Sequence, residues 1–182
     1  SPLVGAFNAS NLLSVQALAL ELGLMPDDLR HLEDFHGVCG RLERVPNARK
    51  LHVFVDYAHT PDALVNVLKA LRGAGFKRIV TVFGCGGNRS KLRRYEMGEV
   101  SGKLADLTII TSDNPRDEEP QAIIDDIKIG MAKTDGKYVE IPDRKEAIAY
   151  AIHHGEPGDI IVLAGKGHED YQEIRGVKHP MD

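Results

Sequence analysis

From residue 51 onward, short apolar runs alternate with stretches whose apolar residues recur at helical spacing, and this alternation constrains the fold more than any other feature. The run 159–165, DIIVLAG, is nearly all apolar, as expected for a parallel strand that is buried on both faces. Strands that alternate with helices form β-α-β units, with their strands parallel in one twisted sheet. The sequence therefore predicts an α/β domain with a mainly parallel sheet flanked by helices.

Capping residues and turn residues set the bounds of the predicted elements. Thr60 and Asp143 are good helix N-caps, and Pro61 suits a first helical position. The predicted strands are 51–58, 77–84, 106–113, 137–142 and 157–165, and the predicted helices are 60–75, 90–105, 119–132 and 143–155.

The two ends of the chain follow other patterns. Residues 10–22 predict a helix capped by Ser10 or Asn11, and residues 26–35 predict a short helical piece. The remaining segments are 36–50, whose Gly, Pro and charge are typical of a connection between domains, and 171–179, which predicts a hairpin arm.

Composition argues against several classes of protein. The chain is 42% hydrophobic with a formal net charge of -4 and no dense basic run, so we expect no nucleic-acid partner. No apolar stretch approaches the roughly 20 residues that a membrane helix needs, so we expect no membrane partner. Cys39 and Cys85 are too few for a disulfide framework or a zinc site. We expect two small buried residues in a protein of the reducing cytoplasm.

Glycine and polar residues follow four of the predicted strands. In open α/β sheets, ligands bind beyond the carboxyl ends of the strands, so these four segments are expected to meet at one site. The segments are 56–61 (DYAHTP), 84–89 (GCGGNR), 112–117 (SDNPRD) and 165–169 (GKGHE).

Each of these loops has a functional and a purely structural interpretation. The glycines of 84–89 could let backbone amides approach an anion, or could simply form a tight turn. The Asn-Pro step would hold the Asn114 amide and the Arg116 guanidinium outward to capture a carboxylate, whereas in a solvated turn Arg116 would pair with Asp117 or Glu118. Glu169 could hold an ammonium group, or could belong to a glycine-rich turn.

Six short motifs carry a family resemblance. They are FNASN (7–11), GRLE (40–43), DYAHTP (56–61), FGCGGNR (83–89), TSDNPR (111–116) and GKGHEDYQ (165–172). In this order they resemble the Mur ligases, and among these the members that add meso-2,6-diaminopimelate. The resemblance covers nearly the whole chain.

The resemblance implies an ATP-dependent amide ligase of peptidoglycan synthesis with three domains. Residues 1–40 would be the end of the central ATP-binding domain, and residues 41–182 would be the Rossmann-like C-terminal domain that binds the amino acid. ATP would activate a carboxylate of UDP-MurNAc-L-Ala-D-Glu as an acyl phosphate, which the amine of diaminopimelate attacks. We expect a monomer whose partners are these three substrates.

The family's nucleotide-activating groups are missing from these 182 residues, which contain no glycine-rich loop ending in Gly-Lys-Thr. ATP and Mg²⁺ are therefore expected as cofactors of the full-length enzyme, and this chain alone is expected to be inactive.

The resemblance also assigns residues. The positions that would hold diaminopimelate are Arg89, Asn114, Arg116, Gly165 and Glu169, and those that would contact the nucleotide are Asn8, Asn11, Arg41, Asp56 and His59; no catalytic residue is assigned. Relatives that add lysine carry a different residue at the position of Arg116, so this arginine implies a substrate with a second carboxylate. The sequence departs from the family at Asn88 and Ser90, where acidic residues are usual, and at Tyr95, where proline is usual.

Two alternatives stay open. A Mur ligase that adds L-lysine would share most of these motifs, although Arg116 argues against it. A non-enzymatic ligand-binding module would keep the same loops without the reaction.

Overall fold

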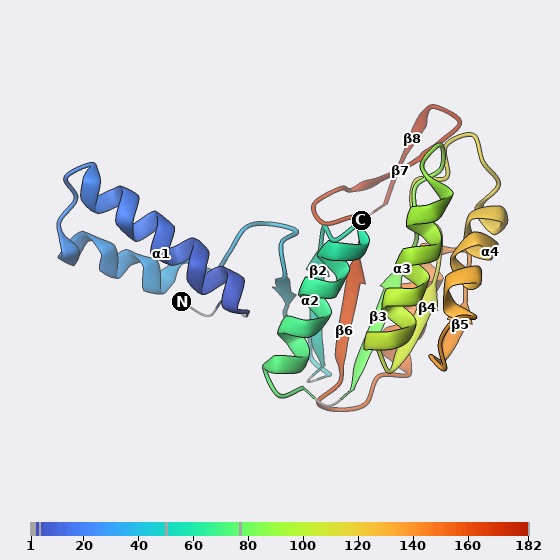
Figure 1. Ribbon diagram of the computed structural model, residues 1–182, viewed down its shortest axis with the longest axis horizontal. Helices are drawn as coiled ribbons and strands as arrows, with labels where there is room; N and C mark the ends of the chain where they lie inside the picture. The colour runs from blue at the N-terminus through green and yellow to red at the C-terminus, as the bar shows by residue number, and fades with distance from the viewer. Residues whose placement is uncertain (1–2, 4, 50, 77, 182) are drawn as a thin grey trace.

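The computed structural model describes residues 3, 5–49, 51–76 and 78–181 and has a six-stranded sheet as its centre (Figure 1). The strand order is β1-β2-β6-β3-β4-β5, and every neighbouring pair is parallel except β1 and β2. The strands are β1 Glu43–Val45, β2 His52–Asp56, β3 Ile79–Phe83, β4 Leu107–Ile110, β5 Tyr138–Glu140 and β6 Ile160–Ala164. The predicted mainly parallel α/β sheet is confirmed.

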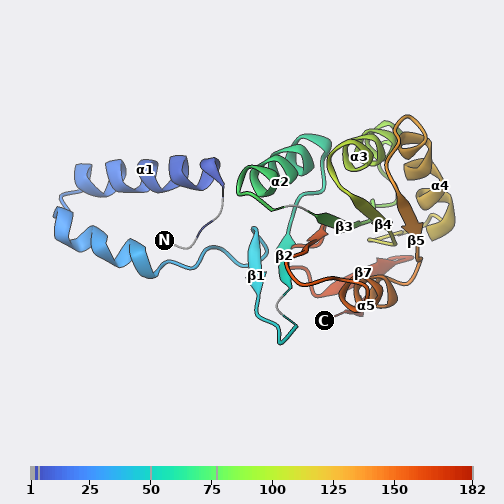
Figure 2. The same cartoon turned by 90° about the horizontal axis from the view of Figure 1, so that it is seen from below.

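Helices cover both faces of the sheet. α2 (Pro61–Gly73), α3 (Lys91–Leu104) and α4 (Pro120–Met131) lie on one face, and α5 (Arg144–His153) lies on the other (Figure 2). Side chains of the central strands alternate between two buried clusters, one against each helical layer. Ile160 and Val162 belong to the first cluster and Ile161 to the second, which explains why β6 is apolar at every position.

The predicted helix caps of the sheet domain are confirmed. The Thr60 side chain accepts a hydrogen bond from the backbone N–H of Ala63, and the Asp143 side chain accepts one from Glu146. Each cap satisfies a backbone donor that would otherwise have no partner at the helix start.

One strand was not predicted. β1 lies inside the segment expected to be a simple connection, and all three of its residues are exposed. A three-residue strand without an apolar side leaves no pattern in the sequence, and here pairing with β2 forms it.

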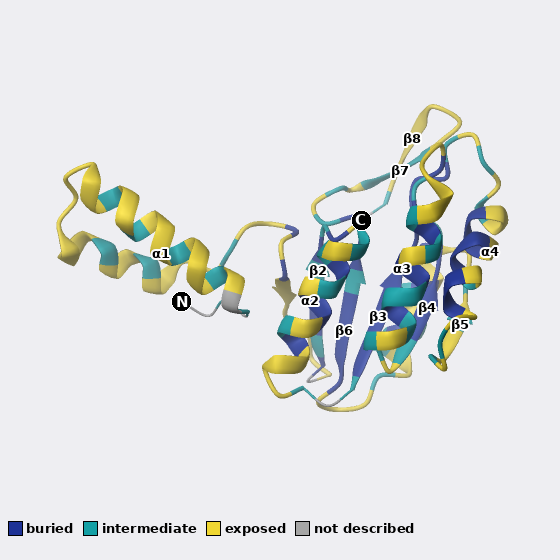
Figure 3. Cartoon of the chain, viewed as in Figure 1, coloured by how far each residue is buried: buried dark blue, intermediate teal, exposed yellow. Residues whose placement is uncertain are grey.

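The N-terminal helices form an arm that extends away from the sheet domain (Figures 1 and 3). The arm consists of α1 (Ala6–Glu21) and the 3₁₀ helix η1 (Pro26–Asp34). The prediction that Ser10 or Asn11 caps the first helix is wrong, because α1 already begins at Ala6 with Gly5 as N-cap. Serine and asparagine cost only a few tenths of a kcal/mol inside a helix, so they do not stop it from extending.

The cysteines differ from each other. Cys85 is buried, and this burial raises the pKa of its thiol to about 12, so the thiol stays protonated at neutral pH. The expectation that Cys39 is buried is wrong, because Cys39 lies in the exposed segment between the arm and the sheet. Within the described ranges, no helix is both long enough and apolar enough to pass through a bilayer.

A hairpin completes the chain. β7 (Tyr171–Ile174) and β8 (Val177–Pro180) pair antiparallel, as the sequence predicted for this segment. The hairpin lies at the end of the sheet toward which β6 points, above the start of α3 (Figure 1). It therefore reaches the carboxyl ends of the parallel strands.

Candidate functional site

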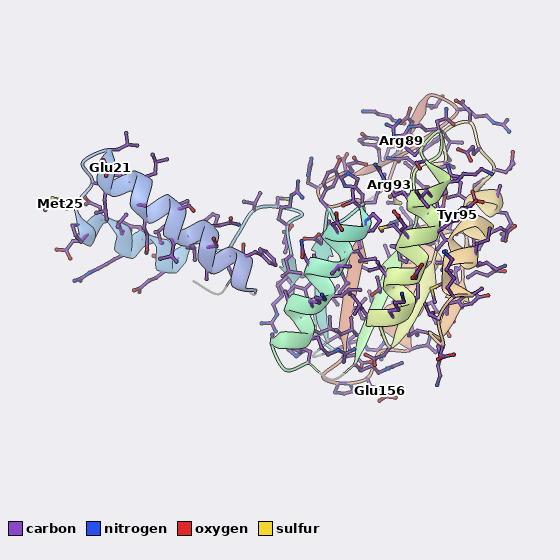
Figure 4. The ribbon with its side chains drawn as sticks, in the orientation of Figure 1. Glu21, Met25, Arg89, Arg93, Tyr95 and Glu156 are labelled. Carbon is purple, nitrogen blue, oxygen red and sulfur yellow. The ribbon has the colours of Figure 1, made fainter. Side chains whose placement is uncertain are left out.

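The four polar strand ends meet in one pocket of about 170 Å³. They meet because β2, β6, β3 and β4 are successive neighbours in the sheet and run parallel. The lining residues are Tyr57, His59, Gly84, Cys85, Gly86, Arg89, Ser90, Arg93, Arg94, Asp113, Asn114, Arg116, Gly165 and Glu169. All five positions expected to hold the amino acid are among them, and Arg89 and Arg93 lie at the N-terminal end of α3 (Figure 4).

Asn114 is the centre of the hydrogen-bond network in this pocket. Its Oδ1 accepts from Lys166 Nζ at 2.6 Å and from the backbone N–H of Glu173 at 2.9 Å. Its Nδ2 donates to Glu169 Oε2 at 3.1 Å. The Asn114 amide does reach out of its own loop, but it is not solvated: the residue is only 6% exposed, and its amide bonds to protein groups of the following segments.

Glu169 does hold an ammonium group, but in this structure it is that of Lys166. Lys166 is 4% exposed, and its Nζ lies 3.1 Å from Glu169 Oε2 and 3.7 Å from Asp113 Oδ1. Burial raises the pKa of Glu169, but hydrogen bonds from Lys166 and Asn114 outweigh burial and hold this pKa below its usual value. Glu169 is therefore a carboxylate at neutral pH, and among the described residues its Oε1 accepts one weak bond, from Tyr57 Oη at 3.3 Å. That oxygen can accept from a bound ammonium group.

Arg116 supplies positive charge from the next loop. Its Nε donates to Glu173 Oε2 at 3.1 Å and its Nη1 donates to the Gly87 carbonyl at 2.9 Å. The pairing with Asp117 or Glu118 that a solvated turn would show is not what the structure has. Instead, the Arg116 side chain is 22% exposed and lines the pocket, as a carboxylate clamp requires.

The backbone at Arg116 is held in an unusual conformation. Its φ of 51° is in the left-handed region, which costs roughly 1–2 kcal/mol for a residue with a side chain. Two backbone hydrogen bonds to the hairpin stabilise it, from Arg116 N–H to the Glu173 carbonyl and from Arg175 N–H to the Arg116 carbonyl. The hairpin and the SDNPR loop therefore form one unit.

The glycine loop after β3 packs tightly against the same unit. A Cβ atom on Gly87 would lie 1.8 Å from the carbonyl oxygen of Pro115, so only glycine fits there. The Gly87 N–H donates to the Asn114 carbonyl at 2.8 Å. These contacts favour the tight-turn interpretation of the loop over an anion-binding one.

A buried arginine fixes the start of α3 to this loop. Arg94 is 1% exposed and forms a bidentate pair with Glu118, with both N–O distances at 2.7 Å. It also donates to Asp126 at 2.9 Å and to the Gly86 carbonyl at 3.2 Å. Asn88, one of the departures from the family, donates to Asp117 at 2.7 Å. The two loops are thus bound to each other without the usual acidic residues beside Arg89.

Gly165 and Arg144 lie beneath the pocket. Gly165 has φ 106°, and a Cβ there would approach Asp113 Oδ2 to 2.9 Å. Arg144 is 3% exposed and donates to the carbonyls of Ser112 and Ala164, so it joins the ends of β4 and β6. Burial lowers the pKa of Arg144, while the nearby Asp113 and Glu169 carboxylates oppose this shift.

The residues expected to contact the nucleotide lie in two places. Arg41 stacks on the Tyr57 ring at 4.8 Å, and the ring of His59 lies 4.7 Å from that of Tyr57 on its edge. Asp56 is 7% exposed, and its two oxygens accept from the backbone N–H groups of Leu42 and Ala58, each at 2.7 Å. Its carboxylate therefore anchors the connection to the arm.

The other two expected nucleotide contacts, Asn8 and Asn11, are on α1 of the arm and do not line the pocket. No group of three or more His, Cys, Asp or Glu side chains suited to a metal ion occurs within the part of the chain that the structure describes.

Three residues of the network were not assigned from the sequence: Lys166, Glu173 and Arg94. Lys166 stands between two glycines in a motif that was singled out, which is a usable signal. Glu173 and Arg94 are placed by the hairpin and by helix packing, and nothing in their local sequence indicates this.

Fold and pocket together define an α/β domain with a pocket lined by side chains of both charges at its strand ends. A family model described as Mur ligase, glutamate ligase domain matches residues 40–167. The chain belongs to the Mur ligase family.

Curated relatives carry more specific names. The UDP-N-acetylmuramoyl-L-alanyl-D-glutamate–2,6-diaminopimelate ligase of Lawsonia intracellularis is 56% identical over 100% of this chain and 37% of that protein. The ligase of the same name from Pseudomonas aeruginosa is 49% identical, again over 100% of this chain and 37% of that protein. The chain thus spans little more than a third of the length of these relatives.

Solved structures agree on the fold. A structure of a ligase of the same name superposes with a TM-score of 0.78 at 42% identity, covering 100% of this chain and 37% of that one. A folylpolyglutamate synthase of Mycobacterium tuberculosis, at 22% identity and a TM-score of 0.66 over 90% of this chain and 38% of that one, shares the fold.

Proposed function

We propose that this chain is the amino-acid-binding part of a ligase that adds meso-2,6-diaminopimelate to UDP-MurNAc-L-Ala-D-Glu, with ATP as energy source. The observation that supports this most is the pairing of opposite charges in one pocket. The Glu169 carboxylate can take an ammonium group, and the Arg116 guanidinium can take a carboxylate. The α-amino-acid end of a ligand carries an ammonium group and a carboxylate, so it needs both of these partners.

Diaminopimelate and lysine both carry two amino groups, but lysine has only one carboxylate. If Glu169 and Arg116 bind one amino-acid end of diaminopimelate, the amine at the other end stays free to attack. If the amine that attacks is the α-amine beside a carboxylate, lysine has only its ε-ammonium group left for the pocket, and this would leave the Arg116 clamp unfilled. Lysine bound in this way would lack the charge-assisted hydrogen bonds to the outer nitrogens of Arg116, and a site built to bind a polar group discriminates against an analogue without it.

In the proposed reaction, ATP phosphorylates the D-glutamate side carboxylate, and the free amine displaces phosphate from the acyl phosphate to form the amide. Arg89, Asn114, Arg116, Gly165 and Glu169 contribute by placing the nucleophile, which is where positioning accelerates such a step. No residue of this chain is assigned to phosphoryl transfer or to Mg²⁺.

We further propose that residues 1–40 end the central ATP-binding domain and that residues 41–182 form the C-terminal domain. Residues 7–39 are all at least partly exposed, as expected if the arm packs on chain outside this structure. Asn8, Asn11, Arg41, Asp56 and His59 would then face a nucleotide at the junction. We propose a monomeric protein of the cytoplasm, where ATP and free thiols are available.

The test measures ADP release by the full-length protein with ATP, Mg²⁺ and UDP-MurNAc-L-Ala-D-Glu. We expect release that depends on meso-diaminopimelate and is at least about tenfold slower with L-lysine, a difference of roughly 1.4 kcal/mol. If neither amino acid led to ADP release, the ligase function would be contradicted. If both led to equal release, the specificity would be contradicted.

A further inference from the structure

Glu173 contacts Arg116, which would take the carboxylate of the ligand, and Asn114, which holds Glu169. Its backbone N–H donates to Asn114 Oδ1 at 2.9 Å, and its backbone carbonyl accepts from Arg116 N–H at 3.1 Å. Its carboxylate accepts from Arg116 Nε, also at 3.1 Å. One residue of the β7–β8 hairpin thus joins the hairpin to Arg116 and to Asn114.

The contact at Nε leaves the outer end of the guanidinium available. Arg116 has five N–H donors: Nε–H is used by Glu173, and one hydrogen of Nη1 is used by the Gly87 carbonyl. Among the described residues, no hydrogen-bond partner is found for Nη2. Nη2 and the second hydrogen of Nη1 can therefore receive a ligand carboxylate while Glu173 stays in place.

The pair is also positioned to be effective. Arg116 and Glu173 side chains are 22% and 30% exposed, so neither moves freely in solvent. The Gly87 carbonyl alone fixes only one point of a planar group, which leaves rotation about that contact. Two contacts at opposite sides of the group, at Nε and at Nη1, fix its plane.

We propose that Glu173 is a specificity-determining positioning residue, which holds the Arg116 guanidinium so that its outer nitrogens meet the second carboxylate of the amino-acid substrate. This inference rests on the proposed function. Glu173 itself does not touch the substrate; it acts through Arg116. The hairpin is thereby part of the specificity site rather than a terminal appendage.

Two variants of Glu173 separate positioning from charge. Glu173→Gln keeps an oxygen that can accept from Nε but removes the negative charge, whereas Glu173→Ala removes both. A positioning role predicts that Glu173→Ala lowers the affinity for meso-diaminopimelate about tenfold and leaves that for L-lysine unchanged, as expected for loss of a charged hydrogen bond. Glu173→Gln should retain most of the selectivity.

The measurement is calorimetric titration of the full-length protein and its variants with meso-diaminopimelate and with L-lysine. Glu119→Gln is the matched control, because it removes the same charge from an exposed surface pair with Arg175 and should leave both affinities unchanged. Thermal melting of each variant shows whether the fold is intact.

The outcomes distinguish this inference from the proposed function. Selectivity that survives in Glu173→Ala would overturn the inference and leave the function standing. Tighter binding of diaminopimelate by both variants would also overturn it, because Glu173 would then be a competitor for Arg116. Failure of the unchanged protein to prefer diaminopimelate would instead count against the proposed specificity.

Discussion

At the scale of single residues, buried charges shape the site before a ligand arrives. Lys166 holds Glu169, Glu173 holds Arg116, and Arg94 holds the loops around them. Lys166, Arg116 and Arg94 each have an oppositely charged partner within hydrogen-bonding reach, which is the condition under which charges are tolerated away from solvent. Removing one partner is costly because it leaves the other charge buried and unpaired.

The Arg94–Glu118 pair makes stability depend on acid pH. The Arg94 guanidinium lowers the pKa of Glu118 from its ordinary 4.5 to about 2. A lowered carboxyl pKa contributes stability that is present above the ordinary value and is lost as the pH falls toward the folded value. We expect the free energy of unfolding to fall between about pH 4.5 and pH 2, measured by urea denaturation.

Glu118→Gln should lower the free energy of unfolding by about 1–2 kcal/mol at pH 7. Its free energy of unfolding should also depend less steeply on pH in the acid range, because the titrating partner of Arg94 is gone. Asp117→Asn is a control in a neighbouring carboxylate that accepts a hydrogen bond from the exposed Asn88 amide. A free energy of unfolding that falls as steeply with acid pH in Glu118→Gln as in the unchanged protein would contradict this assignment.

Residue-scale predictions from sequence succeeded in locating the pocket and missed how its residues support each other. Asn114, Arg116 and Glu169 stand in loops whose composition marks them, and they do line one pocket. Whether they hold the substrate remains a prediction. The hydrogen bonds of the buried Asn114 amide could not be foreseen, because its partners Lys166 and Glu173 are some fifty residues or more away along the chain.

At the scale of elements, the close approach of α3 and α4 depends on glycine. A Cβ on Gly130 would lie 1.8 Å from the carbonyl oxygen of Tyr95, and a Cβ on Gly98 would lie 2.1 Å from that of Ile127. Glycine inside a helix normally costs about 1 kcal/mol relative to alanine, so these positions sacrifice helix propensity for packing. Both helices contribute residues to the larger buried cluster.

We expect Gly130→Ala to destabilise the protein by about 1–3 kcal/mol, since the added methyl group overlaps backbone that cannot move aside easily. Gly73→Ala is the matched control: Gly73 ends α2, and an added Cβ meets nothing within 4 Å. It should be neutral or stabilising by up to about 1 kcal/mol. Equal effects of the two substitutions on the urea midpoint would contradict this account of the packing.

The pattern of elements was predictable from the sequence because each element of the sheet domain has its own signal. Apolar runs mark the central strands, and caps such as Thr60 and Asp143 mark helix starts. β1 was missed because its formation depends on tertiary contacts. Asp56 holds the Leu42 N–H, and this brings the short exposed segment beside β2.

At the scale of the whole molecule, the arm and the sheet domain differ in how they are stabilised. None of the residues 7–39 is buried, and Leu13 and Leu18 of α1 are 65% and 62% exposed. The buried clusters draw on residues from Leu42 onward. The sheet domain therefore contains its own core.

A chain that begins at residue 38 should keep its free energy of unfolding within about 1 kcal/mol, because no buried apolar area is removed from the core. Leu71→Ala in the core, at 0% exposure, should cost about 2–5 kcal/mol and shows that the assay detects core damage. A shortened chain that loses several kcal/mol, or no longer unfolds cooperatively in urea, would mean that the arm belongs to the folding unit.

The central claim is that the four strand ends form an amino-acid site that selects a second carboxylate through Arg116. Calorimetric titration of the full-length protein and of Arg116→Ala, each with meso-diaminopimelate and L-lysine, tests it most directly. We predict that the unchanged protein binds diaminopimelate at least about tenfold more tightly than lysine, and that Arg116→Ala lowers the affinity for diaminopimelate to that for lysine. Equal affinities in the unchanged protein, or selectivity that survives without Arg116, would contradict the claim.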